Sequence, residues 1–131
     1  MISLENILKK SKTIAIIGLS GKPDRPSYQV AEYLISQGFT IIPVNPTIEN
    51  IFGFKSYPSF SDIPPNIKID IVDIFRKSDQ VLPIVEEIVN SGQKPVIWFQ
   101  ESSLNLETEN LAKKNGFEVI SGVCLMKAHQ K

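Results

Sequence analysis

Five short and nearly continuous apolar runs recur along the chain, separated by segments richer in polar residues. They cover residues 13–18, 39–44, 69–75, 95–99 and 117–120. A short run of this kind is typical of a strand that is buried on both faces, as the strands of parallel sheets are. The pattern therefore predicts a sheet of about five strands.

Between these runs, apolar residues recur with the spacing of one face of a helix. The clearest case is the segment 78–90, whose apolar residues fall at positions i, i+3, i+4, i+7 and i+8. Weaker patterns predict helices over about 26–37 and 104–115, and a short packing helix near the N-terminus. A glycine follows each of the three longer segments, as glycine commonly follows the end of a helix.

The regular alternation of these helices and strands predicts the fold class. Strands that alternate with helices of this length form parallel sheets with right-handed crossovers and helices on both faces. We therefore expect one Rossmann-like, doubly wound α/β domain over residues 1–131. The irregular connection 45–68 interrupts the alternation, and within it we expect a small β excursion at 51–57 and a helical turn at 61–63. A connection of this length is usually functional or a packed lid.

Composition and charge narrow the classes of function. The 131 residues are 42% apolar, and fourteen Lys and Arg balance fourteen Asp and Glu, so the net charge is zero. A neutral chain lacks the long-range field that favours non-specific binding to nucleic acids or anionic membranes. No apolar stretch is long enough for a membrane span and no signal peptide is evident, so we expect a cytoplasmic protein. One cysteine and one histidine exclude an intrachain disulfide and a Cys/His zinc cluster.

Candidate binding residues follow the predicted strands, because open α/β sheets bind ligands beyond the carboxyl ends of their strands. The loop after the first strand, residues 18–28, contains two glycines, two serines and two cations before a predicted helix N-terminus. Backbone N–H groups there, together with Lys22 and Arg25, suit a phosphate-rich ligand, and Arg76 follows the third strand at the same edge. The alternative is a tight glycine turn with solvated surface charges.

Two better-known phosphate-binding motifs are absent from this loop. The chain has no Gly-x-x-x-x-Gly-Lys-Ser/Thr sequence, which argues against nucleotide hydrolysis of the P-loop type. It also lacks the Gly-x-Gly-x-x-Gly fingerprint, and no Asp or Glu ends the second strand, which reads Ile-Ile-Pro-Val-Asn-Pro over 41–46. That carboxylate holds the ribose of NAD in dinucleotide-binding folds, so NAD is a disfavoured ligand.

Three stretches of the chain, residues 18–31, 42–46 and 72–76, resemble the small stand-alone CoA-binding proteins. Those proteins are similar to the CoA-binding domain of the succinyl-CoA synthetase α subunit. The likeness covers nearly the whole chain, and the Lys-Pro-Asp-Arg-Pro-Ser-Tyr run is its most specific part. It implies a Rossmann-like domain that binds coenzyme A or acyl-CoA across the carboxyl edge of the sheet.

The resemblance also implies a role for particular residues. The phosphates would be met by Gly18, Ser20, Lys22 and Arg25, while Ser27 and Tyr28 would cap the helix or touch the ligand. The adenosine side would be lined by Asn45 and Pro46, and the nucleotide would be bordered near the third strand by Ile74, Phe75 and Arg76. The chain departs from the family pattern at 101–104, where a glycine is usual, and at 122–124, where Gly-Val-Cys replaces Asp-Arg-Cys.

Two aspartates near the third strand look catalytic but do not form a pair. Asp70 and Asp73 are three residues apart, so in a strand their side chains project to opposite faces. We expect Asp73 to accept hydrogen bonds from loop backbone at the edge of the sheet. Paired-carboxylate chemistry is therefore not predicted.

The remaining reactive or aromatic residues also have structural interpretations. A lone cysteine such as Cys124 usually packs as a small apolar residue, and His129 lies close enough to the chain end that we expect it to be mobile. Trp98 and Phe99 lie within a predicted strand, where aromatic residues usually belong to the core. No catalytic or metal-binding residue is predicted.

The sequence therefore favours a non-catalytic module that binds coenzyme A or acyl-CoA. One alternative is a subunit of an acyl-CoA- or nucleotide-using enzyme that a partner chain completes. Another is a regulator that binds a nicotinamide nucleotide, which the missing carboxylate makes the weaker choice. Neither nucleic acid nor membrane is an expected partner, and self-association is left open.

Overall fold

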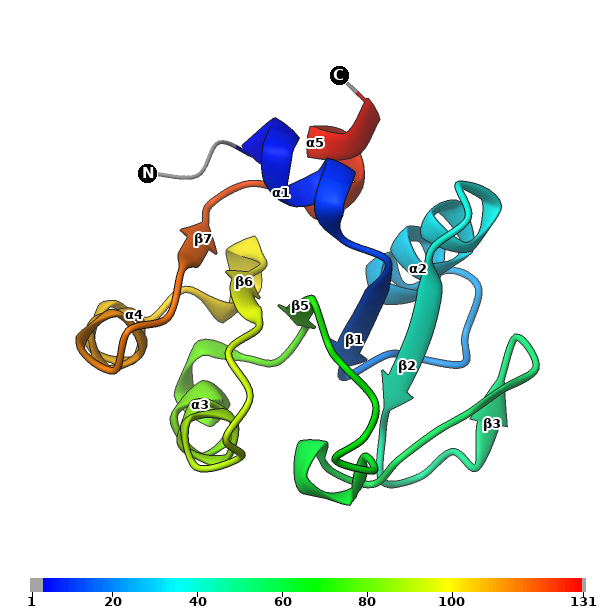
Figure 1. Cartoon of the computed structure of the whole chain (residues 1–131). Coiled ribbons are helices and arrows are strands. Elements are labelled where there is room, and N and C mark those ends of the chain that lie inside the picture. The colour runs from blue at the N-terminus through cyan, green and yellow to red at the C-terminus, as the bar shows by residue number, and fades with distance from the viewer. Residues whose placement is uncertain (1–3, 131) are drawn as a thin grey trace.

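A five-stranded parallel sheet forms the centre of the computed structural model, which describes residues 4–130 (Figure 1). Its strand order is β2-β1-β5-β6-β7. The bounds are Thr13–Ile17 for β1, Thr40–Val44 for β2, Ile71–Ile74 for β5, Val96–Phe99 for β6 and Val119–Ser121 for β7. Every neighbouring pair in this sheet is parallel. The predicted Rossmann-like α/β fold is confirmed.

Helices cover both faces of the sheet. They are α1 (Leu4–Lys10), α2 (Pro26–Ser36), α3 (Val81–Val89), α4 (Leu106–Lys114) and α5 (Leu125–Gln130). The helices α1, α2 and α5 pack on one face, and α3 and α4 pack on the other (Figure 1). The predicted helix at 78–90 begins as a 3₁₀ turn, Ser78–Gln80, and another such turn, Glu101–Ser103, precedes α4. The helix α5 was not predicted.

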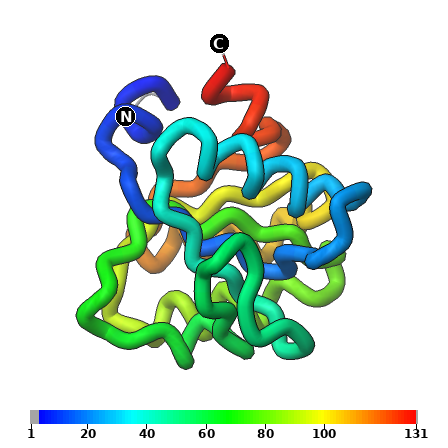
Figure 2. Tube along the Cα trace, turned by 90° about the vertical axis from the view of Figure 1, so that its right-hand side faces the viewer, coloured from blue at the N-terminus to red at the C-terminus, as the bar shows by residue number. Residues whose placement is uncertain are grey.

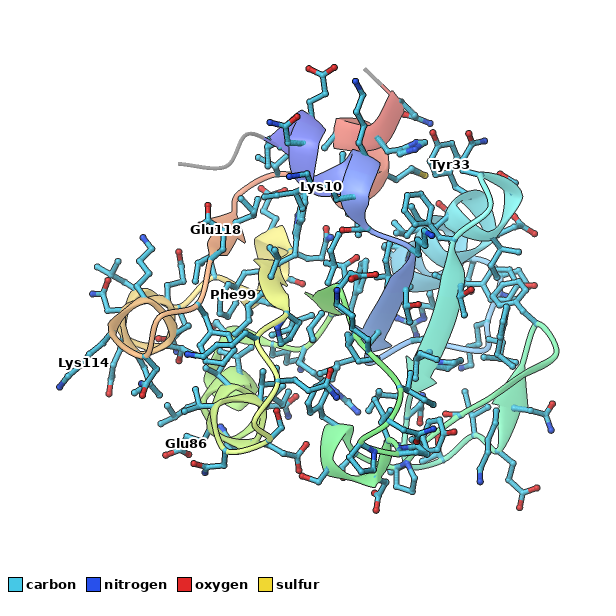
Figure 3. All side chains as sticks on the ribbon, viewed as in Figure 1. Lys10, Tyr33, Glu86, Phe99, Lys114 and Glu118 are labelled. Atoms are coloured by element: carbon cyan, nitrogen blue, oxygen red, sulfur yellow. The ribbon has the colours of Figure 1, made fainter. Side chains whose placement is uncertain are left out.

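Side chains alternate between the two faces along each strand, as a pleated strand requires. In β6, the side chain of Trp98 belongs to the cluster under α1, α2 and α5, and that of its neighbour Phe99 to the cluster under α3 and α4. Both are fully buried, so their predicted place in the core is confirmed. Glu86 and Lys114 project outward from α3 and α4, away from the sheet (Figure 3).

The irregular connection after β2 folds back along the edge of the sheet. It contains an antiparallel pair, β3 (Asn50–Ile51) and β4 (Phe54–Lys55), and a 3₁₀ turn at Phe60–Asp62. These match the predicted β excursion and helical turn. An isolated parallel bridge joins Val44 at the end of β2 to Tyr57, whose N–H also donates to Pro43 O at 3.0 Å. Figure 2 shows the molecule from the side on which this connection lies.

No helix within residues 4–130 has the length and apolar character that crossing a bilayer requires.

Candidate functional site

A groove of about 910 Å³ opens at the carboxyl ends of β1, β5 and β6, beneath the helices α2 and α5. Strand order reverses here, because the chain leaves β1 toward β2 and leaves β5 toward β6, in opposite directions. Such a reversal is where open α/β sheets form ligand sites. The groove is lined by Gly18, Ser20, Lys22, Arg25, Pro26, Ser27, Gln29, Val30, Phe75, Gln100, Glu101, Ser102, Gly122, Cys124, Met126 and Lys127.

Gly18 turns the chain at the bottom of this groove. Its φ of +89° lies in the left-handed region, and a Cβ on this residue would lie 2.5 Å from the carbonyl oxygen of Phe75. Its N–H donates to Val44 O at 2.9 Å, and the N–H of Phe75 donates to Ile17 O at 2.8 Å. Only glycine combines a positive φ with the absence of a Cβ, and both are needed for the loop after β1 to lie directly against the end of β5.

Two serines join this loop to the start of α2. The backbone N–H of Ser20 donates to Ser27 Oγ at 2.9 Å, and the N–H of Lys22 donates to Ser20 Oγ at 3.1 Å. Ser27 is buried and uses its hydroxyl to hold the loop, so the sequence-based suggestion that it caps α2 is wrong. Arg25 occupies the N-cap position of α2, but its side chain accepts no hydrogen bond from the helix. The N–H groups of the first helical turn therefore have no side-chain acceptor at the N-cap.

The charge at this end of the groove is positive. The side chains of Lys22 and Arg25 are exposed and line the groove, and neither forms a salt bridge within the described residues. Lys127 of α5 adds a third cation, and Glu101 after β6 is the one acidic side chain of the lining. Unpaired cations beside a helix N-terminus favour an anionic ligand such as a phosphate.

Six of the predicted ligand residues therefore come together in the groove, and five do not. Those that line it are Gly18, Ser20, Lys22, Arg25, Ser27 and Phe75. Tyr28 points elsewhere, since its ring lies 4.6 Å from that of Phe52. Ile74 is fully buried in the core under α3 and α4, so its predicted place at the border of the nucleotide is wrong for its side chain.

Asn45, Pro46 and Arg76 lie at the rim of the sheet outside the groove. Asn45 holds two loops together, because its Nδ2 donates to Leu19 O at 2.9 Å and its Oδ1 accepts from Thr47 N at 2.8 Å. Pro46 lines a second hollow of about 730 Å³ beside β3 and β4. The N–H of Arg76 donates to Ser103 Oγ at 3.0 Å, which joins the loops after β5 and β6. Contact of these three residues with a nucleotide stays a prediction.

Asp73 was predicted to accept hydrogen bonds from loop backbone, and this prediction is wrong. Asp70 makes such bonds instead. Asp70 Oδ2 accepts from the backbone N–H groups of Lys12 and Thr13 at 2.8 and 3.0 Å. Asp73 is instead fully buried, and its Oδ1 accepts from Gln100 Nε2 at 2.6 Å. Burial raises the pKa of Asp73 to about 7, and the hydrogen bond from Gln100 opposes the rise only in part.

Sequence reasoning missed the far side of the groove, where Gln100 and residues around Cys124 line it. Gln100 directly follows β6, so the rule that selected the other loops would have found it. Cys124 is half-buried and lies just before the unpredicted helix α5. His129 in that helix is hydrogen-bonded through Nδ1 to the hydroxyl of Tyr33 at 2.7 Å, a contact that the sequence did not indicate, and its expected mobility stays a prediction. Within residues 4–130, no group of three or more His, Cys, Asp or Glu side chains is placed to hold a metal ion.

Comparison with known proteins places this geometry in a family. An uncharacterized protein of Bacillus subtilis, YneT, is 40% identical over 96% of this chain and 91% of its own length. The structure of a hypothetical protein from Pyrococcus horikoshii superposes with a TM-score of 0.89 at 37% identity, covering 98% of this chain and 91% of that one.

A larger enzyme contains a related segment. The ADP-forming acetate–CoA ligase II of Archaeoglobus fulgidus is 29% identical over 82% of this chain, which spans only 17% of the ligase. The family profile described as "CoA binding domain" matches residues 12–130, nearly the whole chain. The protein therefore belongs to the CoA-binding domain family and is related to ADP-forming acyl-CoA synthetases.

Proposed function

We propose that this protein binds coenzyme A or an acyl-CoA in the groove between α2 and α5, and that it does so without catalysing a reaction. The proposal rests on two cations without salt-bridge partners among the described residues, Lys22 and Arg25, which lie beside the uncapped N-terminus of α2. The chain that carries them belongs to the CoA-binding domain family. The volume of about 910 Å³ is within the usual range for small-molecule sites.

The residues around Gly18 fit the phosphate end of this ligand. Coenzyme A carries a pyrophosphate and a 3′-phosphate, which together need more donors than one helix end supplies. Here the exposed side chains of Lys22 and Arg25 add charge, and the missing Cβ of Gly18 lets the backbone approach closely. In this binding mode the phosphates lie against the loop after β1.

The rest of the groove fits the uncharged arm of the ligand. Apolar or weakly polar side chains of Val30, Phe75, Cys124 and Met126 line it together with the amide of Gln100. A pantetheine arm is flexible and mostly apolar, with amide groups that need hydrogen bonds. The protein's task in this proposal is to hold and orient that arm, since no hydrogen bond between a nucleophile and a base is found among the described groove residues.

Calorimetric titration with coenzyme A tests the proposal, using protein freed of any ligand that co-purifies. Saturable binding is expected, with a stabilisation of about 2.7 kcal/mol at a hundredfold excess over the Kd. Arg25→Ala and Lys22→Ala should each weaken coenzyme A about tenfold and leave pantetheine, which has no phosphate, nearly unchanged. Lys114→Ala on the outer face of α4 is the matched control and should change neither affinity. Absence of binding, or equal losses for both ligands, would contradict the proposal.

A second candidate is a subunit that a partner chain completes into a CoA-using enzyme. The observation in its favour is that the Archaeoglobus fulgidus ligase is much longer than this chain, which spans 17% of it. Purification of the tagged protein from its own cells distinguishes the two. A stoichiometric partner whose addition gives turnover of an acyl-CoA supports the enzyme subunit, whereas binding by the isolated chain with no such partner supports the binding module. Titration with NADH tests the nicotinamide alternative, for which little binding is expected.

A further inference from the structure

The side chain of Gln100 lies between the ligand groove and the buried carboxyl of Asp73. It is only 6% exposed, yet it belongs to the lining of the groove. Its Nε2 donates to Asp73 Oδ1 at 2.6 Å, which is a short, charge-assisted distance for such a bond. The amide therefore faces a fixed protein partner on one side and the groove on the other.

The carboxyl group determines which way this amide points. An ionised carboxylate accepts hydrogen bonds and donates none, so the NH₂ group of Gln100 faces Asp73 whenever that residue is ionised. Within the described residues, no group donates to Gln100 Oε1. The buried side-chain polar atoms without a partner there are Asp73 Oδ2 and Thr108 Oγ1, and Oε1 is not among them. Gln100 Oε1 is therefore a free acceptor that is reached from the groove.

The position of Gln100 relates this acceptor to a particular part of the ligand. It follows β6, which is separated by β5 from the cationic loop after β1. Gly122 and Cys124, beyond the neighbouring strand β7, line the groove on its other side. A carbonyl oxygen at this place repels phosphate and matches an uncharged N–H donor.

We infer that Gln100 is a specificity-determining residue, which accepts a hydrogen bond from an amide N–H of the pantetheine arm, and that Asp73 is the positioning residue that turns its oxygen toward the groove. This inference rests on the proposed function. The hydrogen bond to Gln100 would favour ligands with a pantetheine arm over nucleotides that share the phosphates but lack the amide groups. Loss of the acceptor leaves a buried N–H of the arm without a partner, which is costly.

Protonation of Asp73 would weaken this arrangement, because a neutral carboxyl donates from its O–H and lets the amide turn its NH₂ group to the groove. On the sheet Asp73 lies between Ile16 and Trp98, which carry no charge. The titratable groups on the elements packed over that face and at the groove are Glu5, Lys9, Lys10, Lys22, Arg25, Tyr28, Glu32, Tyr33, Lys55, Glu101, Cys124, Lys127 and His129. None of these forms a hydrogen bond or ion pair with Asp73 in the described structure, so its proton equilibrium depends mainly on burial and Gln100.

The test compares two ligands on the variant Asp73→Asn. The ligands are coenzyme A and adenosine 3′,5′-bisphosphate, which has phosphates and adenosine but no pantetheine arm. An asparagine can present either its carbonyl oxygen or its NH₂ group to Gln100, so it no longer fixes the amide, which becomes able to turn its own NH₂ group to the groove. We expect coenzyme A to bind several-fold more weakly and the bisphosphate to change by less than about twofold. Asp70→Asn makes the same substitution at the other end of β5 and should leave the ratio of the two affinities unchanged.

Two further measurements test the inference if the Asp73→Asn variant folds poorly. Gln100→Met has a similar shape without hydrogen-bonding groups and should show the same selective loss for coenzyme A. In the unmodified protein, the ratio of the two affinities should rise several-fold in favour of coenzyme A between about pH 6 and pH 8. Equal losses for both ligands, or no loss for either, would overturn the role of Gln100. Binding of neither ligand to the unmodified protein would instead refute the proposed function.

Discussion

The backbone N–H of Ser20 donates to the hydroxyl of Ser27 at 2.9 Å, which ties the loop after β1 to the first turn of α2. Ser27 is buried and Ser20 is half-buried, so this bond is partly removed from water. The loop also carries Lys22, whose N–H donates to Ser20 Oγ. One hydroxyl in the helix thus fixes the place of the loop that presents a cation to the groove.

Ser27→Ala should reduce both stability and ligand affinity. The N–H of Ser20 would lose its acceptor in a half-buried position, which costs about 1 kcal/mol. Urea denaturation measures the free energy of unfolding, and titration measures the affinity for coenzyme A. Ser36→Ala is the control at the exposed end of the same helix, where the hydroxyl donates to Tyr33 O, and should cost less than about 0.5 kcal/mol. An equal effect of both substitutions would contradict the role given to Ser27.

Gly18→Ala should destabilise the protein more than Gly38→Ala. Both glycines have positive φ, at +89° and +93°, so both substitutions carry the strain of a left-handed backbone, about 1 kcal/mol. Only at Gly18 would the added Cβ collide with backbone, at 2.5 Å from Phe75 O, whereas nothing lies within 4 Å of the same position at Gly38. Thermal or urea unfolding of the two variants measures the difference, and equal losses would show that the close approach of Gly18 to the carbonyl of Phe75 does not restrict the side chain at position 18.

The apolar runs predicted all five strands of the main sheet, because most residues of β1, β2, β5 and β6 are buried and the half-buried β7 still contains two apolar residues. Boundaries moved by one or two residues where the outer residue of a run, such as Phe39, lies beside the strand and packs in the core. The helix α5 was missed because its six residues are too few to show a helical period. It is held by tertiary contacts such as the hydrogen bond between His129 and Tyr33, which no local pattern encodes.

The stability of the protein should depend on the protonation of Asp73. Burial raises its pKa from 3.8 to about 7, so between these values the folded state holds a proton that the unfolded state has lost. The contribution of this group is therefore largest below about pH 4, falls as the pH rises toward 7, and stays low above it. The full difference is about 4 kcal/mol, since one pKa unit corresponds to about 1.4 kcal/mol.

Asp73→Asn isolates this contribution, because the amide cannot ionise. The variant and the unmodified protein should have similar stability near pH 4, and the variant should be more stable by up to about 4 kcal/mol near pH 8. Urea denaturation at a series of pH values gives this difference directly. A constant difference across the series would mean that the carboxyl does not titrate in this range.

Trp98→Phe should loosen the segment that follows β7. The indole Nε1 of Trp98 donates to Val123 O at 2.7 Å, so the substitution leaves that carbonyl without its partner and costs about 1–2 kcal/mol. Hydrogen exchange should accelerate at the amides around Cys124 more than at those of α4, which packs on the opposite face. Uniform acceleration throughout the chain would indicate a general loss of packing instead.

The cationic side of the site was predicted from the sequence, whereas the side-chain pairing on its other side was not predictable. A glycine-containing loop with Lys22 and Arg25 before a helix is visible in the sequence, and the topology rule then gives its place at the sheet edge. The pairing of Asp73 with Gln100 depends on the register between β5 and β6, which the sequence does not show. The wrong expectation for the side chain of Ile74 followed from the family resemblance, whereas its hydrophobicity and its place in a strand already indicated a core residue.

The connection that folds back along β2 has a consequence for assembly. Pro43 within β2 has no N–H, and its carbonyl already accepts from Tyr57, while the N–H of Asn45 donates to Tyr57 O. A strand from another molecule would find few free N–H and C=O groups with which to pair at the carboxyl end of β2. Hydrogen bonds within the chain thus protect this end of the edge strand β2 from pairing with other molecules, although β2 contains no charged residue.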